Sequence, residues 1–116
     1  MHKQPFIYIL ASGRNGTLYV GVTGALSDRM SVHTQDLNEG FTKKYGVHCL
    51  VYYEWHETFD EAFRREKQLK GWKRAWKIRL IEQMNPDWAD LYDALSGEIR
   101  DGPADLQRQN EKDDDK

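Results

Sequence analysis

Cysteine, internal repeats and long apolar runs are scarce or missing in this sequence, and each shortage excludes a class of protein. The single Cys49 among 116 residues excludes an internal disulfide and a metal site built from several thiolates, and it fits a reducing compartment. No run approaches the roughly 20 apolar residues that a membrane span requires, and the N-terminal residues lack the pattern of a secretory leader. We therefore expect a cytoplasmic protein that does not associate with membranes.

The charge of the chain is unevenly distributed. Residues 1–95 hold 13 Lys and Arg against 12 Asp and Glu, whereas residues 96–116 hold 4 against 7, so the net charge of −2 comes from the end of the chain. This last segment is polar and poor in aromatic and β-branched residues, so it buries too little surface to offset its ordering entropy. We predict one folded domain over residues 5–95 and a disordered acidic tail over residues 97–116.

Three segments have the residue types of strands. Residues 6–10 and 17–22 are rich in Ile, Val, Tyr and Leu, and the segment between them, Ser12–Gly16, supplies turn residues. This arrangement predicts an antiparallel hairpin. Residues 48–57 are equally dense in β-branched and aromatic types and predict a third strand.

The spacing of apolar residues predicts helices in the segments that follow. A first short helix is expected over residues 26–37. Thr58 followed three residues later by Glu61 is a capping box, so a second helix is expected from about residue 59. Gly71 interrupts the helical pattern, and we expect the chain to break there and restart over residues 73–84.

The last predicted helix begins where Asn85 offers a cap and Pro86 stands at the first helical position. Its expected extent is residues 85–95. The element order is then β-β-α-β-α-α-α. We predict an α+β fold in which a small three-stranded antiparallel sheet is flanked by helices.

Basic residues gather in the second and third predicted helices. Between positions 64 and 79 there are eight Lys and Arg residues and one acid, Glu66. Such clustering provides the contacts that a phosphate backbone needs, whereas the alternative is a solvated helix face in which Glu66 only pairs with Lys70 four residues later. The candidates for nucleic-acid binding are Lys43, Lys44, Lys70, Lys73, Arg74 and Lys77.

Five side chains have the chemistry of a hydrolytic site. Tyr8 and Tyr19 lie on the two strands of the predicted hairpin, although each alone is a common strand residue. Arg29 and His33 are four residues apart and share one helix face, although His33 alone is more typical of a partly buried packing residue. With Glu66 they would supply a proton acceptor, a phosphate clamp and a hard oxygen ligand for Mg²⁺ or Mn²⁺.

The hairpin resembles the two-motif hairpin of the GIY-YIG nucleases. Phe6-Ile7-Tyr8 stands where the first motif would be, and Tyr19-Val20-Gly21 closely matches the second, with ten residues between the two tyrosines. The glycine of the first motif is Phe6 here, which we interpret as a packing substitution at the strand start. Gly21 would let the backbone approach the site closely.

The resemblance extends over residues 5–90 and is strongest to the small stand-alone members of the family. Arg29 with His33 resembles the helix arginine of the family and its accompanying histidine, and Glu66 corresponds to the invariant glutamate. The resemblance implies hydrolysis of DNA phosphodiester bonds with one Mg²⁺ or Mn²⁺ ion. The substrates it suggests include damaged or branched structures.

The resemblance also implies a role for each side chain. Glu66 would hold the metal, and Arg29 would stabilise charge on the scissile phosphate. Tyr8 would act as general base, which requires positive charge nearby because an unperturbed phenol has a pKa of about 10. Tyr19 and His33 would orient the water or the phosphate, or relay the proton.

Three alternatives were weighed against this interpretation. A module on the same fold that binds nucleic acid or protein without cutting would not need all five site residues. Covalent attack by a tyrosine is disfavoured because such sites bring several Arg and His residues from a larger helical domain. Trp72, Trp76 and Trp88 are expected in the hydrophobic core and not on a dimer surface, so a monomer is favoured.

Overall fold

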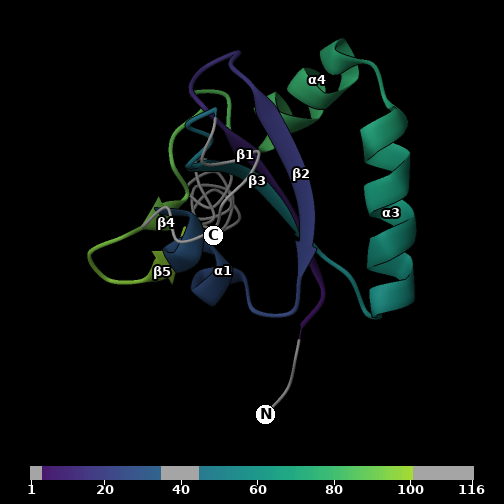
Figure 1. Ribbon diagram of the computed structural model, residues 1–116. Helices are drawn as coiled ribbons and strands as arrows, with labels where there is room; N and C mark the ends of the chain where they lie inside the picture. Colours follow the sequence, from purple (N-terminus) through teal and green to yellow (C-terminus); the bar gives the residue numbers. More distant parts are fainter. Residues whose placement is uncertain (1–3, 35–44, 101–116) are drawn as a thin grey trace, which may run out of the picture.

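The structure, a computed structural model, describes residues 4–34 and 45–100 (Figure 1). Its centre is an antiparallel sheet of three strands, β1 (Phe6–Ala11), β2 (Leu18–Thr23) and β3 (Cys49–Trp55), in the order β2-β1-β3. The predicted hairpin and third strand are confirmed, and so is the α+β class. The distal end of the first predicted helix and Lys43 and Lys44 lie outside the described residues.

The register of the hairpin decides which side chains share a face of the sheet. Tyr8 lies opposite Gly21, and Leu10 lies opposite Tyr19. Because side chains alternate along a strand, Tyr8 and Tyr19 project from the same face, while Ile7 and its alternate neighbours project from the other.

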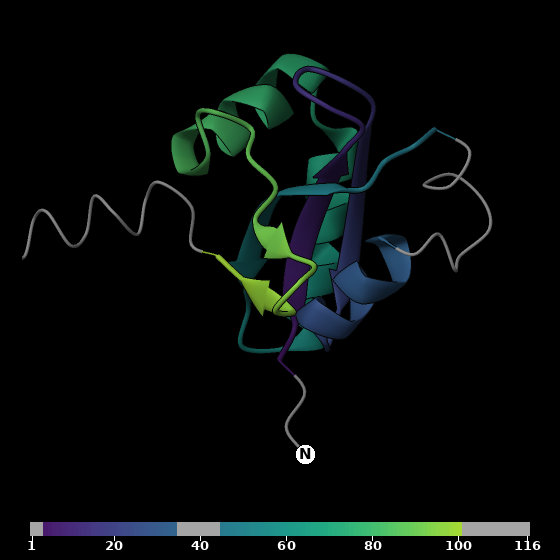
Figure 2. The ribbon, with the colours of Figure 1, turned by 90° about the vertical axis from the view of Figure 1, so that its left-hand side faces the viewer.

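Each face of the sheet is covered by different elements. The helices α3 (Phe59–Gly71) and α4 (Arg74–Met84) cover one face, and α3 packs against β2 and β1. The opposite face carries α1 (Leu26–Thr34) and a small hairpin, β4 (Tyr92–Asp93) with β5 (Glu98–Ile99), which stands next to α1 in Figure 2. None of the helices in the described ranges has the length and apolar character needed to cross a membrane.

A buried apolar cluster lies on each face. Under α3 and α4 it comprises Ile7, Ile9, Ala11, Val20, Val51, Tyr52, Ala62, Leu69, Ile81 and Trp88. On the face of α1 it comprises Tyr8, Leu10, Leu26, Met30, Val47, Leu50, Leu91 and Tyr92. Tyr8 therefore belongs to a packed environment that restricts movement of its ring.

The predicted limits of the second and third helices are confirmed. The Thr58 hydroxyl accepts a hydrogen bond from the Glu61 amide at 3.1 Å, so the capping box begins α3. The helix ends at Gly71, and the Trp72 amide donates to the Leu69 carbonyl at 3.1 Å. The chain then turns and restarts as α4 at Arg74, which fixes the angle between the two helices.

The prediction of a helix over residues 85–95 is wrong, because no helix follows α4 in the described residues. Asn85 is fully buried, and its side-chain amide donates to the Val51 carbonyl at 3.2 Å and to the Ala89 carbonyl at 2.8 Å. Trp88 has a φ of 57°, a left-handed conformation that a right-handed helix excludes. The Asp90 carboxylate accepts from the Leu50 amide at 3.1 Å. Side-chain hydrogen bonds to β3 and a buried tryptophan therefore outweigh the local helical pattern.

The folded structure continues beyond the boundary expected from the sequence. The sequence predicts a disordered tail from residue 97, but β5 pairs with β4, and the Arg100 amide donates to the Leu91 carbonyl at 2.7 Å. The Tyr53 hydroxyl also donates to the Arg100 carbonyl at 3.0 Å. The remainder of the predicted tail lies outside the described residues.

The tryptophans do not all belong to the core. Trp88 is 6% exposed and Trp72 packs partly buried against the core, in line with the prediction. Trp76 is 47% exposed, so the core prediction is wrong for this residue. Its ring stands beside that of Trp72, where the two helices meet.

Candidate active site

The Tyr8 phenol occupies space that only a glycine at position 21 leaves open. Tyr8 is 2% exposed, and its ring lies over the backbone of its cross-strand partner Gly21. A Cβ atom at position 21 would stand 2.5 Å from both Cζ and Oη of Tyr8, far inside van der Waals contact. The glycine of the second motif therefore sets the position of the tyrosine of the first.

Tyr19 is the second phenol of the site. It is half-buried, and its ring centroid is 6.2 Å from that of Tyr8, with a 39° angle between the rings. The two rings project from the same face of the hairpin because Leu10, two residues after Tyr8, is the partner of Tyr19. The hairpin register alone brings both phenols to one place.

The pKa of Tyr8 reports which charged groups share its surroundings. Burial raises this pKa above the ordinary value of 10.0, and Tyr19 raises it further through its charge and hydrogen bonding. The Arg29 guanidinium lowers it, and the Glu66 carboxylate raises it. The pKa of Tyr8 on β1 therefore responds to charged or polar groups from β2, α1 and α3, namely Tyr19, Arg29 and Glu66.

The net direction of this shift differs from the sequence-based expectation. A general base at neutral pH needs a lowered pKa, and Arg29 acts in that direction as expected. Burial outweighs it, so in the protein alone the Tyr8 phenol keeps its proton more firmly than a free phenol does.

A short connection between β2 and α1 brings Arg29 to the site. Strand β2 ends at Thr23, whose hydroxyl accepts a hydrogen bond from the Ala25 amide at 3.1 Å, and α1 begins at Leu26. The Arg29 amide then donates to the Ala25 carbonyl at 3.0 Å in the first turn of the helix. The Arg29 side chain is exposed, so its guanidinium is accessible from solvent.

Glu66 lies on α3 and has a lysine as its partner. The Lys70 ammonium lies 3.2 Å from Oε2 of Glu66, which is the i, i+4 pair considered from the sequence. The side chain of Glu66 is 23% exposed and that of Lys70 is 56% exposed. The carboxylate is therefore accessible from solvent and is held by a partner that can be exchanged.

The donor set of this region fits a magnesium-type ion. Among the described residues, no three His, Cys, Asp or Glu side chains gather as a metal cluster would require. Mg²⁺ keeps most of its water ligands and is commonly bound by one or two carboxylates together with substrate phosphates. A single accessible carboxylate, Glu66, meets that requirement, whereas zinc would need several nitrogen or sulfur ligands.

Several of the predicted residues are placed elsewhere or not described. His33 belongs to α1, but its side chain lies outside the described part of the structure. The Arg74 guanidinium donates to the carbonyl groups of Asn15 and Gly16, so it holds the β1–β2 turn, and contact of this exposed residue with nucleic acid stays a prediction. Lys73 is exposed and Lys77 partly exposed, so both remain candidates for nucleic-acid contact.

Phe6, which replaces the first-motif glycine, is a packing residue. Its ring meets that of Tyr53 edge to face, with 5.9 Å between the centroids. It also packs against the buried cluster that contains Tyr8. The replacement therefore adds an aromatic contact next to the tyrosine and leaves the register of the hairpin intact.

A second polar cluster was not identified from the sequence. Glu54 on β3 accepts hydrogen bonds from the Tyr52 hydroxyl and from Nε of Arg65 at 2.8 Å, and Nε2 of His56 lies 2.8 Å from it. Burial raises the pKa of Glu54, but the hydrogen bonds from Arg65, Tyr52 and His56 outweigh burial and lower it overall. Tyr52, Glu54 and His56 occupy alternate positions along β3 and the residue after it, a spacing that places side chains on one face of an extended segment. This spacing is the feature of the sequence from which the cluster could have been predicted.

The hairpin with its two tyrosines and the sheet of order β2-β1-β3 lie in a segment that matches a known nuclease domain. Residues 4–79 match the GIY-YIG catalytic domain, so the chain belongs to the GIY-YIG family, a family of nucleases that generally depend on divalent metal ions.

Its relatives within the family include UPF0213 proteins of Staphylococcus aureus, among them those of strains Mu3 and N315. Each is 37% identical over 78 residues, which are 67% of this chain and 94% of the relative. The chain is also similar to the solution NMR structure of the UPF0213 protein BH0048 from Bacillus halodurans. That similarity has 26% identity and a TM-score of 0.44, and it covers 69% of this chain and 84% of the other.

Proposed function

We propose that the protein is a metal-dependent endonuclease that hydrolyses DNA phosphodiester bonds. The observation that carries this proposal is the hairpin geometry, which places the ring of Tyr8 over Gly21 with the ring of Tyr19 6.2 Å away, where the charges of Arg29 and Glu66 also act on Tyr8. Membership of the GIY-YIG family supports the same chemistry. We further propose that it acts in the cytoplasm as a monomer on damaged or branched DNA.

Arg29 and a cation held by Glu66 would together bind the scissile phosphate. Glu66 would hold Mg²⁺ or Mn²⁺, and the bound cation would neutralise charge on the phosphate and on the leaving 3′ oxygen. The exposed Arg29 guanidinium can donate two hydrogen bonds to a non-bridging phosphate oxygen pair. Lys70 would leave the Glu66 carboxylate at this stage and would then be free to contact a neighbouring phosphate.

Tyr8 would handle the proton of the attacking water. In its ionised form the phenolate oxygen takes one proton from water, while the water oxygen bonds to phosphorus and the 3′ oxygen departs. Since burial raises the pKa of Tyr8, only a small fraction is ionised at neutral pH. Tyr19, whose ring lies beside it, would orient the water or pass the proton on, and His33 would assist from α1.

The proposal is tested with a panel of linear, nicked, flapped and branched DNAs. Purified protein is incubated with each substrate in Mg²⁺, in Mn²⁺ and in EDTA, and wild type is compared with Glu66→Ala. We expect metal-dependent cutting by wild type and none by the variant, with DNA binding retained by both. If wild type binds these DNAs but cuts none of them in either metal, the protein is a binding module on the nuclease fold.

A further inference from the structure

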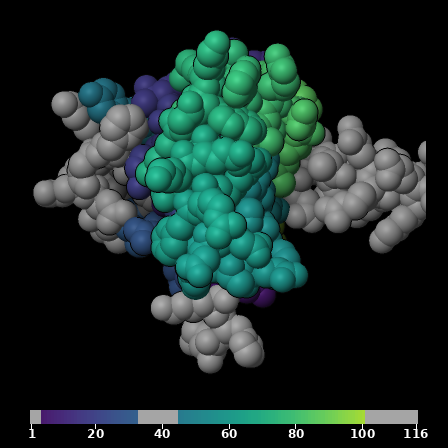
Figure 3. All heavy atoms as spheres, turned by 90° about the vertical axis from the view of Figure 1, so that its right-hand side faces the viewer, coloured from purple at the N-terminus to yellow at the C-terminus, as the bar shows by residue number. Residues whose placement is uncertain are grey.

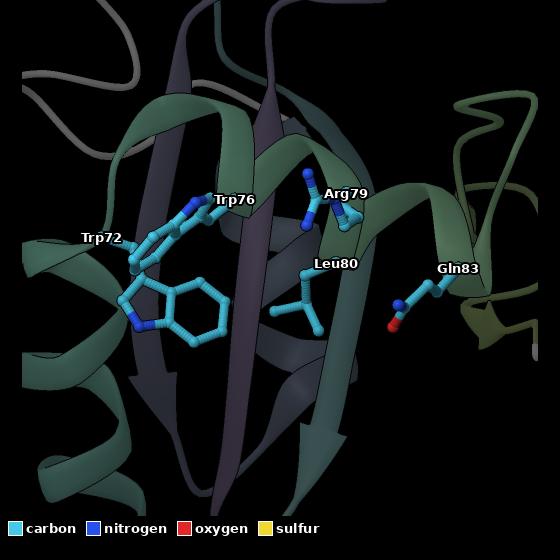
Figure 4. A pocket seen from close by; sticks show the side chains of 5 residues that line it. All are labelled: Trp72, Trp76, Arg79, Leu80 and Gln83. Carbon is cyan, nitrogen blue, oxygen red and sulfur yellow. The ribbon is translucent and has the colours of Figure 1, made fainter.

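A pocket lined by two tryptophans lies at the junction of α3 and α4. It has a volume of about 230 Å³. Its lining residues are Trp72, Trp76, Arg79, Leu80 and Gln83, and we call it the tryptophan pocket. Figure 4 shows the two indole rings at one end, Leu80 in the middle and Gln83 at the other end. Neither the family resemblance nor the proposed catalytic residues account for it.

The aromatic end of the pocket is held in place. The rings of Trp72 and Trp76 meet edge to face, with 5.9 Å between centroids and an 82° angle. The Arg65 guanidinium lies 5.1 Å from the centroid of Trp72 and is itself fixed by Glu54 at 2.8 Å. Trp72 is therefore held by contacts with Trp76 and Arg65, and Trp76, which is 47% exposed, is accessible from solvent. A ligand would lose little binding energy to ordering these side chains.

We propose that the tryptophan pocket binds one unstacked base of single-stranded DNA. Indole rings offer flat faces on which any base can stack. Arg79 and Gln83 add a guanidinium and an amide, which are the groups that hydrogen-bond to base edges. The volume lies below the roughly 300–1,000 Å³ of pockets for drug-sized ligands, so it suits one planar ring system.

Charge around the pocket favours this occupant over an apolar protein segment. Arg79 lines it, and Lys73 and Lys77 directly follow its two tryptophans in the chain; within the described part of the chain none of the three cations lies within ion-pair distance of a carboxylate. Glu82, the acid on α4, instead accepts a hydrogen bond from Nε1 of Trp88 at 2.7 Å. The cations are thus available to the phosphates on either side of a bound base.

The tryptophan pocket lies close in the chain to Glu66 of the proposed cleavage site. The inference about preferred substrates drawn from this position rests on the proposed function. Glu66 lies on α3, and Trp72 is the residue that directly follows the end of this helix, six residues after Glu66. Figure 3 shows α3 and α4 on one face of the molecule. The preferred substrates would then have unpaired nucleotides beside the cut, as flaps and branches do.

The test measures binding without cleavage. Fluorescence anisotropy in EDTA gives the affinity of the full chain for a labelled single-stranded 12-mer, for the matching duplex, and for the same strand carrying abasic positions. We expect Trp76→Ala to weaken binding of the intact single strand by about fivefold to 100-fold, the range for loss of a base-stacking aromatic. Trp76→Phe should retain most of the affinity, and the abasic strand should bind both variants equally.

Trp55→Ala is the matched control, because Trp55 is 55% exposed but lies at the end of β3, away from the pocket. Circular dichroism confirms that each variant is folded. The inference is overturned if Trp76→Ala and Trp55→Ala bind the single strand alike, or if the loss at Trp76 is equally large on the abasic strand. It is also overturned if Trp76→Ala changes only the sedimentation of the protein, because the pocket would then face a second copy.

The two proposals fail separately. Loss of single-strand binding in Trp76→Ala, with no cutting by wild type in Mg²⁺ or Mn²⁺, supports the pocket and contradicts the nuclease. Metal-dependent cutting by wild type, with unchanged single-strand binding in Trp76→Ala, supports the nuclease and contradicts the pocket.

Discussion

Two carboxylates, Glu54 on β3 and Glu66 on α3, differ in the number of groups that hold them. Glu54 receives hydrogen bonds from Tyr52 and Arg65 and lies against His56, and its side chain is 19% exposed. Glu66 has one ion pair among the described residues, to the exposed Lys70. The difference separates two uses of the same chemical group. A carboxylate whose lone pairs are filled by fixed donors holds β3 to α3, whereas one with an exchangeable partner can bind a cation.

The largest expected difference between the two carboxylates is in DNA cleavage after each one is neutralised in turn. Glu66→Gln keeps the size of the side chain but removes the charge that would hold the metal. We expect cleavage of DNA in Mg²⁺ to fall at least about 10³-fold, as when a major electrostatic stabiliser is lost. Glu54→Gln, the same substitution in the other cluster, should keep most of the activity per folded molecule. Equal losses in the two variants would contradict the division of roles.

A smaller effect is expected from crowding the site without changing its charges. Gly21→Ala places a Cβ atom 2.5 Å from the Tyr8 hydroxyl oxygen, and the buried ring can yield only by displacing that oxygen. We expect about a 10²-fold loss of cleavage, the cost of roughly 1 Å of misplacement. Gly13→Ala in the same hairpin is the control, because a Cβ there meets nothing within 4 Å. Unchanged activity in Gly21→Ala would show that the position of Tyr8 does not matter.

The pH dependence of cleavage tests whether Tyr8 is the general base. Because its pKa is raised, the ionised fraction increases about tenfold for each pH unit throughout the neutral and mildly alkaline range. We expect kcat/KM for cleavage to rise with pH between about 7 and 9 in wild type and in Tyr19→Phe. In Tyr8→Phe the residual rate should not follow this slope. A flat wild-type profile would argue against Tyr8 as the base.

Glu54 is expected to affect stability instead of activity. Glu54→Gln should lower the free energy of unfolding, measured in urea at pH 7, by about 2 kcal/mol because Arg65 loses its charged acceptor. The folded-state pKa of Glu54 is lowered from 4.5, so its contribution is present above that pH and is lost as the pH falls through the folded value. The two proteins should therefore converge in stability in acid. Glu66→Gln, the matched control, should change stability by less than about 0.5 kcal/mol.

Local patterns predicted much of the fold because local causes formed it. The hairpin followed from its β-branched and aromatic runs, and the limits of α3 followed from Thr58 and Gly71. The segment after Asn85 had equally good helical signals, yet its side chains bond to β3. Sequence periodicity does not contain these long-range partners, so the prediction failed there.

The candidate site depends on local and long-range causes in the same way. Motif spacing predicts Tyr8 and Glu66 as site residues, but the effect of the Glu66 charge on the pKa of Tyr8 depends on how α3 packs across β1 and β2. The raised pKa of Tyr8 follows from burial, which charge counting along the chain does not register. In the sequence Arg74 does not differ from the other cations of its helix, because its hydrogen bond to the β1–β2 turn joins residues 59 positions apart.

Metal binding compared across three proteins tests the central claim most directly, namely that Glu66 and not Glu54 is the metal ligand of the site. Free Mn²⁺ is measured by electron paramagnetic resonance during titration of wild type, Glu66→Gln and Glu54→Gln. We predict that wild type and Glu54→Gln bind the same number of ions and that Glu66→Gln lacks one site. Retention of that site in Glu66→Gln, or its loss in Glu54→Gln, would contradict the account.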